Sequence, residues 1–273
     1  MTPSSKSGFA AVNNANIYYE FSGNGTPFVM IHAGVADHRQ WNNEFASFTS
    51  KYRVLRYDQR GFGKSEPVEG DYSYMRDLES LLEFLGIHKP LVLMGCSMGG
   101  VMAMDFTLTH PTLVKALIMV DSGPSGLNLD VPESDKFADA EKAFKEGDLD
   151  LVSEIETQIW FDGTGRTPQQ VNQEMRKLLF EMNRIALGHE VKNTGKRTPN
   201  LEIPAAERLH ELLCPVLVIV GANDGPYSLA AADHMVKHIK SARKVVIDNA
   251  GHLPNMEHPQ QFHAILSQFL DSL

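Results

Sequence analysis

A serine between small residues is the first candidate for chemistry in this chain. The motif Gly-Cys-Ser-Met-Gly at 95–99 directly follows the apolar run 91–94. Small residues on both sides of a serine let a strand reverse sharply into a helix, which exposes the hydroxyl on a strained turn. A helix-like segment, 98–110, comes next, so the order strand, turn, helix predicts that Ser97 is a nucleophile. The alternative is a tight glycine-rich turn with an incidental serine.

A serine hydroxyl is a poor nucleophile near neutral pH, so a base must accept its proton. Of the eleven histidines, His252 stands in the loop 250–254, which contains a glycine and follows the apolar run 244–247. A tight loop after a strand lets the imidazole project, and we therefore predict that His252 is the general base. The alternative is a histidine whose ring is satisfied by hydrogen bonds within its own loop.

A third group must hold the base in the right tautomer. Asp224 lies in a glycine-rich loop after the apolar run 216–220, and Asp121 directly follows the run 116–120. Both are candidates, because both strand ends would lie on the same rim of the sheet. The order serine, aspartate, histidine across separate late strand ends matches the nucleophile-elbow hydrolases and favours Asp224. Asp121 takes the role if Asp224 only caps its own loop.

Negative charge that develops on a carbonyl oxygen needs N–H donors already in place. The amide of Met98 follows the candidate serine at the start of a helix, where free amides favour negative charge. The second donor is predicted in the loop 32–35, with Gly34 preferred over Ala33 and Val35. The histidine that begins this loop is predicted to brace it.

Two further motifs could suggest a bound phosphate or metal ion, but we predict that neither binds one. The loop 58–65 contains three small or flexible positions but lacks the spacing of a phosphate-binding P-loop. We interpret it as a loop braced by Asp58 and Arg60 that shapes the site. His234 and His238 lie one helical turn apart without a third obvious ligand, which is typical of a solvated helix face. No metal site and no cofactor are predicted.

The strands and helices that must position these residues alternate along the chain. Seven short apolar runs predict strands: 17–21, 28–31, 52–57, 91–94, 116–120, 216–220 and 244–247. Apolar residues recur at the spacing of one helical face over 74–85, which predicts a helix that Gly86 ends. Continuous rather than alternating hydrophobicity is typical of buried parallel strands flanked by helices. The sequence therefore predicts an α/β fold with a mostly parallel sheet.

Strand signals disappear between about residues 124 and 204. This segment is polar and predicts helices over 133–145, 148–161 and 168–187. Helices that leave the sheet after one strand and return before the next would form a lid over the strand ends, where open parallel sheets bind ligands. We therefore predict a core of residues 1–123 and 205–273 with an inserted helical cap, 124–204.

Length and composition bound the class of protein. A chain of 273 residues suits one large domain with an insertion, and a net charge of −9 without a long basic run argues against nucleic acid or a membrane as partner. Cys96 and Cys214 are predicted to be free thiols. No segment approaches the roughly 18 apolar residues of a membrane span, and the start lacks the apolar core of a signal peptide, so a cytoplasmic location is expected. Nothing in the sequence predicts the oligomeric state.

Together these motifs resemble the α/β-hydrolase superfamily over essentially the whole chain outside the predicted cap. Five successive motifs carry the resemblance: 32–34, 58–65, 95–100, 221–224 and 251–254. The resemblance implies an eight-stranded, mostly parallel sheet with helices on both faces and an inserted helical cap. It also implies Ser97 as nucleophile, Asp224 as acid and His252 as base, with the amides of Gly34 and Met98 as the oxyanion hole.

Two departures from the family pattern narrow the activity. Ala33 replaces the glycine usual in the first motif. Ser97 stands where the similar dehalogenases and epoxide hydrolases have an aspartate nucleophile, which disfavours those two activities. Meta-cleavage hydrolases usually have a tryptophan just after the catalytic histidine, whereas Leu253 and Pro254 follow here, which looks more like the carboxylesterase and enol-lactonase branch.

The resulting hypothesis is a cofactor-free serine hydrolase that cleaves small, largely apolar carboxylic esters or lactones through an acyl-enzyme on Ser97. Alternatives on the same triad are a carbon–carbon bond hydrolase, a perhydrolase or an amidase. An alternative of another class is a ligand receptor that keeps the triad but turns over slowly. Five residues are predicted to line an apolar substrate pocket, the alternative being that they pack the cap onto the sheet: Trp160, Phe161, Phe180, Met182 and Leu253.

Overall fold

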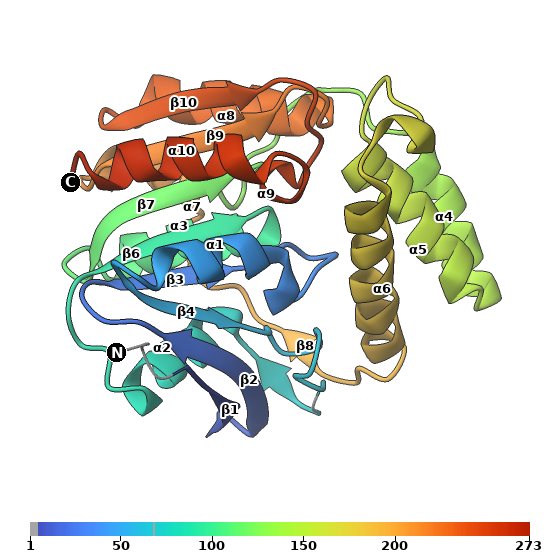
Figure 1. Ribbon diagram of the computed structural model, residues 1–273. Coiled ribbons are helices and arrows are strands. Elements are labelled where there is room, and N and C mark those ends of the chain that lie inside the picture. Colours follow the sequence, from blue (N-terminus) through green and yellow to red (C-terminus); the bar gives the residue numbers. More distant parts are fainter. Residues whose placement is uncertain (1–4, 68) are drawn as a thin grey trace.

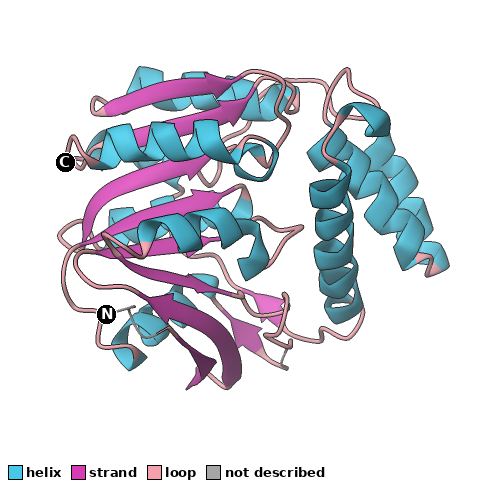
Figure 2. Ribbon diagram, viewed as in Figure 1, coloured by secondary structure: helices cyan, strands magenta, loops and turns pink. Residues whose placement is uncertain are grey.

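An eight-stranded sheet forms the centre of the protein (Figures 1 and 2). The computed structural model describes residues 5–67 and 69–273, so the first four residues of the predicted core lie outside it. The strands are β1 Lys6–Val12, β2 Ala15–Ser22, β3 Pro27–Ile31, β4 Arg53–Tyr57, β6 Leu91–Cys96, β7 Val114–Val120, β9 Val216–Gly221 and β10 Ala242–Ile247. Their order across the sheet is β1-β2-β4-β3-β6-β7-β9-β10.

Six of these strands run parallel, and two complete one edge. β4, β3, β6, β7, β9 and β10 pair in parallel, whereas β2 is antiparallel to both β1 and β4. From β3 the chain goes to β4 on one side and then returns to β6 on the other, so the loops after β3 and β6 leave the sheet side by side. A reversal of this kind opens a crevice at the carboxyl ends of the strands. The predicted α/β fold with a mostly parallel, eight-stranded sheet is confirmed.

The central strands are apolar along their whole length because helices cover both faces. Every residue of β3, β6 and β9 is buried. In Figure 1, α1 (Asn42–Phe48) and α10 (Pro259–Leu270) cover the near face, and α3 (Met98–Thr109) and α8 (Pro226–His238) the far face. The remaining core helices are α2 Tyr74–Phe84, α7 Ala205–Arg208 and α9 Pro254–Glu257.

Three helices form a separate layer beside the carboxyl ends of the strands, at the right of Figure 1. They are α4 Lys136–Glu146, α5 Leu149–Thr157 and α6 Gln173–Glu190, all within the segment predicted as a cap. After α6, the short strand β8 (Lys196–Arg197) pairs with β5 (Asp71–Tyr72), which ties the returning chain to the core.

The cap helices differ from the predicted ranges at their ends. The helix predicted over 148–161 is α-helical to Thr157 and continues as a π-helical segment, 158–162. The helix predicted from residue 168 begins at Gln173, because Pro168 opens a separate 3-10 turn and Asn172 caps the new helix by accepting from the next N–H groups. Among the described residues, no helix is long and apolar enough to cross a bilayer.

A buried polar contact joins α1 to α9, the short helix that follows His252. Asn255 Nδ2 donates to the carbonyl of Gln40 at 2.8 Å and to the carboxyl of Glu44 at 3.2 Å. Glu44 is 1% exposed, and burial raises its pKa to about 7. The contact therefore contains a carboxyl group that titrates near neutral pH in the folded protein.

We expect Glu44→Gln to stabilise the protein at about pH 8 and to have little effect near pH 4.5. The unfolded chain releases this proton at an ordinary glutamate pKa and the folded protein only near 7, so wild-type stability falls as pH rises through that window. The gain at high pH should reach at most roughly 3 kcal/mol. Urea unfolding at both pH values measures it, with the exposed Glu146→Gln as control. A gain that shrinks as pH rises would contradict the assignment.

Candidate active site

Ser97 occupies a strained turn between β6 and α3. Its backbone has φ 53° and ψ −119°, a region that residues other than glycine rarely adopt. The neighbouring glycines are required by close backbone approach. A Cβ on Gly95 would overlap the carbonyl of Gly99, and a Cβ on Gly99 would lie 2.5 Å from the carbonyl of His32. The small residues of the motif therefore let the turn pack against the loop after β3.

His252 and Asp224 form a buried pair after β10 and β9. His252 Nδ1 lies 2.7 Å from Asp224 Oδ2, and Asp224 Oδ1 accepts the N–H of Gly225 at 2.7 Å. Burial is the largest single influence and raises the pKa of Asp224, but the charge and hydrogen bond of His252, together with smaller contributions from Asp121 and Ser228, lower it on balance. The Nε2 atom of His252 is buried and has no hydrogen-bond partner among the described residues. His252 and Ser97 both line one cavity of about 780 Å³.

Asp121 lies beside this pair without bonding to the imidazole. It follows β7, is 1% exposed and has φ 43°. Its Oδ1 accepts the N–H of Gly221 at 2.8 Å. Of the two candidate acids, the structure therefore places Asp224 against His252 and Asp121 behind it.

The three atoms that Asp121, Asp224 and His252 offer lie within 4.8 Å of one another, which raises the question of a metal. Ligands bound at about 2.0–2.1 Å to a tetrahedral ion lie well over 3 Å apart. The 2.7 Å between His252 and Asp224 is instead a hydrogen-bond distance. The cluster therefore fits a shared proton better than a cation.

The loop 32–35 reaches the serine turn from β3. The Ala33 amide donates to Gln40 Oε1 at 2.9 Å, which leaves Gly34 and Val35 as the loop's candidate donors. A Cβ on Gly34 would lie 3.6 Å from Met98 Cβ, so the two predicted oxyanion donors belong to neighbouring residues. The Met98 N–H begins α3 and has no acceptor within the helix.

His32 braces this loop rather than facing the cavity. Its Nδ1 donates to the carbonyl of Ala33 at 2.8 Å, and its Nε2 accepts the N–H of Gln59 at 2.9 Å. Complete burial lowers its pKa, which keeps the ring neutral and this tautomer in place. His32 thus links the loops after β3 and β4.

Hydrogen bonds made by Asp58 and Arg60 brace the loop 58–65. Asp58 Oδ1 accepts both the N–H and Nδ1 of His38 at 2.7 Å, and its Oδ2 accepts the N–H of Lys64 at 2.8 Å. Arg60 donates to both oxygens of Asp77 at 2.8 and 2.9 Å. These contacts form a protein-internal brace of the kind expected from the sequence.

The cap is hydrogen-bonded to both loops that hold the buried pair. The N–H of Thr164 donates to the carbonyl of Asn223 at 2.6 Å, and the N–H of His252 donates to the carbonyl of Trp160 at 2.9 Å. The Trp160 ring also lies 4.5 Å from the His252 ring, centroid to centroid. The segment 160–166 therefore helps to fix the position of the imidazole, a contribution that sequence reasoning missed.

Arg166 completes this attachment through a buried ion pair. Its guanidinium contacts Glu257 at 2.7 Å, with the two side chains 5% and 4% exposed. It also donates to the carbonyls of Asn249, Phe161 and Asp162. Glu257 in turn accepts the N–H of Gly251 at 2.6 Å, directly before His252. No ordinary sequence motif marks this pair, because its members lie 91 residues apart.

A cavity of about 780 Å³ opens over Ser97 and His252. Its walls combine the strand ends with the cap segments 128–137 and 158–166. The side chains of Val101, Phe137 and Trp160 make part of the wall apolar. This volume lies in the range of sites for small organic ligands.

Of the five residues predicted to line the substrate pocket, Trp160 lines this cavity and the others do not. Phe161, Met182 and Leu253 are completely buried in the hydrophobic cluster that packs the cap against the sheet. Phe180 is half-buried and lies outside the lining of this cavity. Packing thus accounts for Phe161, Met182 and Leu253, which corrects the prediction for those residues.

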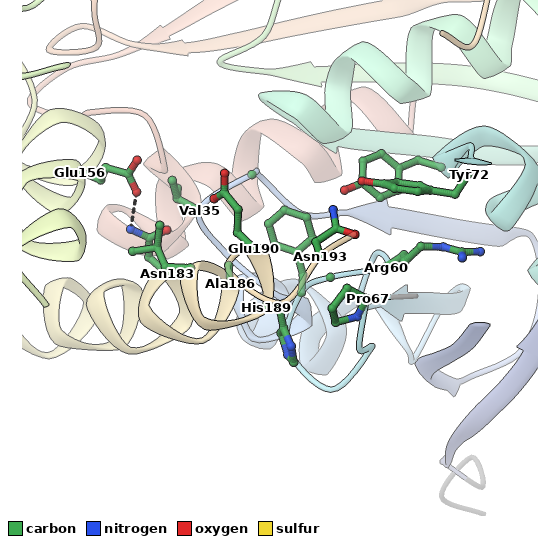
Figure 3. Close-up of a pocket in the computed structure, with 15 residues that line it drawn as sticks. Val35, Arg60, Pro67, Tyr72, Glu156, Asn183, Ala186, His189, Glu190 and Asn193 are labelled. Carbon is green, nitrogen blue, oxygen red and sulfur yellow. Dashed lines mark hydrogen bonds between the residues drawn. The ribbon is translucent and has the colours of Figure 1, made fainter. Parts of the chain in front are cut away.

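A smaller cavity of about 270 Å³ lies on the other side of the loop 32–35, between the cap and the core (Figure 3). At one end Glu156 accepts a hydrogen bond from Asn183 at 2.7 Å, and at the other lie Arg60 and Tyr72. The two cavities share no lining residue. Gly34 and Val35 line this smaller cavity, whereas Ser97, Met98 and His252 line the larger one.

Comparison with known proteins agrees with this architecture. The model of the alpha/beta hydrolase family matches residues 28–265, and the chain belongs to that family. It is 27% identical over 239 residues to 3-oxoadipate enol-lactonase 1 of Acinetobacter baylyi, which covers 87% of this chain and 85% of that protein. It is also 27% identical to a pimeloyl-acyl-carrier-protein methyl ester esterase of Aeromonas hydrophila, over 93% and 99% of the two chains. The solved enol-lactonase of Burkholderia xenovorans shares the fold, with a TM-score of 0.78, 24% identity and coverage of 96% and 99%.

We expect Arg166→Met to destabilise the protein by roughly 3–5 kcal/mol, because it leaves Glu257 charged and buried without its partner. The same change should lower kcat for any reaction that uses His252, since the loop before the imidazole loses its tie to the cap. Chemical unfolding and steady-state kinetics measure the two effects. Arg184→Met, which breaks an exposed pair with Asp150, is the matched control. Equal effects of the two variants would show that the buried pair has no special role.

Proposed function

We propose that the protein is a serine hydrolase of small, largely apolar carboxylic esters or lactones. The observation that carries the proposal is the buried His252–Asp224 pair, whose free Nε2 shares a cavity with Ser97 on its strained turn. The names of two relatives, an enol-lactonase and a methyl ester esterase, support the choice of bond.

In the first half of the reaction, Nε2 of His252 accepts the proton of the Ser97 hydroxyl as Oγ attacks the substrate carbonyl. Asp224 holds Nδ1 and stabilises the imidazolium that forms. The amides of Met98 and Gly34 donate to the new oxyanion. The tetrahedral species collapses, the imidazolium protonates the departing alkoxide or enolate, and the acyl group remains on Ser97.

In the second half, His252 removes a proton from water, and the resulting hydroxide attacks the acyl carbonyl. Collapse of the second tetrahedral species releases the carboxylic acid and returns the proton to Ser97. A lactone follows the same course, except that its leaving group stays attached to the acyl chain. No group outside these side chains, backbone amides and water is needed.

We expect Ser97→Ala to lower kcat for p-nitrophenyl butyrate by at least about 10,000-fold, because no other group in the proposed mechanism forms the acyl-enzyme. Circular dichroism should show an unchanged fold. Ser50→Ala, an exposed serine after α1, is the control. If Ser97→Ala and wild type hydrolysed the ester at equal rates, the proposal would fail. Tight ligand binding without multiple turnover would favour a receptor instead.

The apolar wall of the larger cavity predicts a preference for longer acyl chains. Each buried methylene is worth about 0.8 kcal/mol, or roughly fourfold in kcat/KM, until the cavity is filled. Phe137→Ala removes part of this wall, where its ring lies 5.6 Å from that of Trp160. We expect a shallower rise of kcat/KM from acetate to hexanoate esters. Phe84→Ala changes an exposed phenylalanine of α2 that does not line this cavity, and it should keep the wild-type slope.

A further inference from the structure

The carboxyl group of Asp121 lies beside the reacting pair, yet the mechanism above gives it no role. Atoms of Asp121, Asp224 and His252 lie within 4.8 Å of one another, and Asp121 is 1% exposed. Its Oδ1 accepts the N–H of Gly221. Its Oδ2 is buried and has no partner among the hydrogen bonds of the described residues. A buried carboxyl oxygen in this position is costly unless it carries or receives a proton.

The hydrogen bonds indicate which of the two carboxyl groups holds the negative charge. Asp224 accepts at both oxygens, from His252 Nδ1 and from the N–H of Gly225. Asp121 accepts at Oδ1 alone. Two carboxylates this close do not both ionise, because their repulsion is large in a buried site. The proton therefore belongs on Oδ2 of Asp121, where it can be donated to Asp224.

The other groups around Asp121 favour the same assignment. Asp224 and Glu257, from the loop after β9 and from α9, are both acidic. Cys96, at the end of the adjacent β6, is a thiol whose pKa burial raises, so it stays neutral. The imidazole of His252 is already held by Asp224. Burial and the charge of Asp224 raise the pKa of Asp121 well above its usual range.

We propose that Asp121 is a positioning residue, a neutral carboxylic acid whose Oδ2–H donates to the carboxylate of Asp224 and fixes its orientation toward His252. The proposal rests on the proposed function, because it gives Asp121 a part in the same site. It differs from the role of an alternative acid, since a neutral Asp121 contributes a hydrogen bond and no charge.

Two substitutions separate the hydrogen bond from the charge. Asp121→Asn keeps an acceptor for Gly221 and an N–H donor for Asp224, whereas Asp121→Leu, of similar size, offers neither. We expect Asp121→Leu to lower kcat for p-nitrophenyl butyrate about 10- to 100-fold, the effect of one hydrogen bond to a charged group, with little change in KM. Asp121→Asn should recover most of that loss. Asp139→Asn, the same change at an exposed site of α4, is the control.

A second measurement needs no substrate. In the folded protein Asp121 keeps its proton above the pH at which an unfolded aspartate loses it, so unfolding in this window releases a proton and wild-type stability falls as pH rises. Asparagine does not titrate. The Tm of Asp121→Asn should therefore increase relative to wild type as pH rises above the unfolded-aspartate pKa of about 3.9, while Asp139→Asn shows no such trend.

Two outcomes would overturn the proposal. One is an Asp121→Asn variant as slow as Asp121→Leu, which would mean that an amide donor cannot replace the acid. The other is a Tm difference that favours wild type increasingly as pH rises, which would mean that Asp121 is ionised in the folded protein. The Tm series tests Asp121 even if Ser97→Ala retains full activity and the proposed function fails. The Tm series also tests whether Asp121 is protonated in the folded protein if Asp121→Leu does not fold.

Discussion

The parallel register of β6, β7, β9 and β10 is the constraint on which the rest of the site depends. The hydrogen-bond ladders of β6, β7 and β9 each continue one residue beyond the strand, from the Ser97 N–H to Val120, from the Asp121 N–H to Ile219 and from the Ala222 N–H to Ile247. Backbone hydrogen bonds alone therefore hold the first residues after these strands in fixed positions. Glycines then let the loops approach closely, as where a Cβ on Gly221 would overlap the carbonyl of Gly251. A slip of one residue would turn these side chains to the opposite face of the sheet.

The segment predicted as a cap contributes to this arrangement through direct contacts. Its segment 160–166 is bonded to the loops of Asp224 and His252 through backbone groups and through the buried Arg166–Glu257 pair. The second half of α6, 183–190, instead faces the core across the smaller cavity, which Arg60 and Glu156 also line. Two layers of the fold therefore position the imidazole of His252. The end of β10 places its loop, and the segment 160–166 is hydrogen-bonded to that loop.

The sequence predicted features that depend on neighbouring residues in the chain. It did not predict features that depend on how distant segments pack together. The glycines around Ser97, Asp224 and His252 record close backbone approach, and continuous apolar runs record burial, so the fold and the loops that form the site could be predicted. The edge strand β1 gave no comparable signal, because one of its faces is open and Phe9 is 54% exposed. Phe161 and Met182 are large apolar residues of the kind that line substrate pockets. Only the packing of the cap shows that both are instead buried in the hydrophobic cluster. The closeness of Asp121 to Asp224 is likewise not visible in the sequence, because 103 positions separate them.

Charge balance explains why a neutral acid suits the position behind Asp224. In the proposed reaction, His252 takes the serine proton and becomes an imidazolium beside one carboxylate, and this pair has no net charge. A second ionised carboxyl would leave the buried cluster with an excess negative charge at the moment when an oxyanion forms nearby, which raises the energy of that state in a medium of low dielectric. A protonated Asp121 instead disperses part of the charge of Asp224 through a hydrogen bond. The same burial that makes this carboxyl hard to ionise thus lets it act as a donor, because only the protonated form has a hydrogen to give.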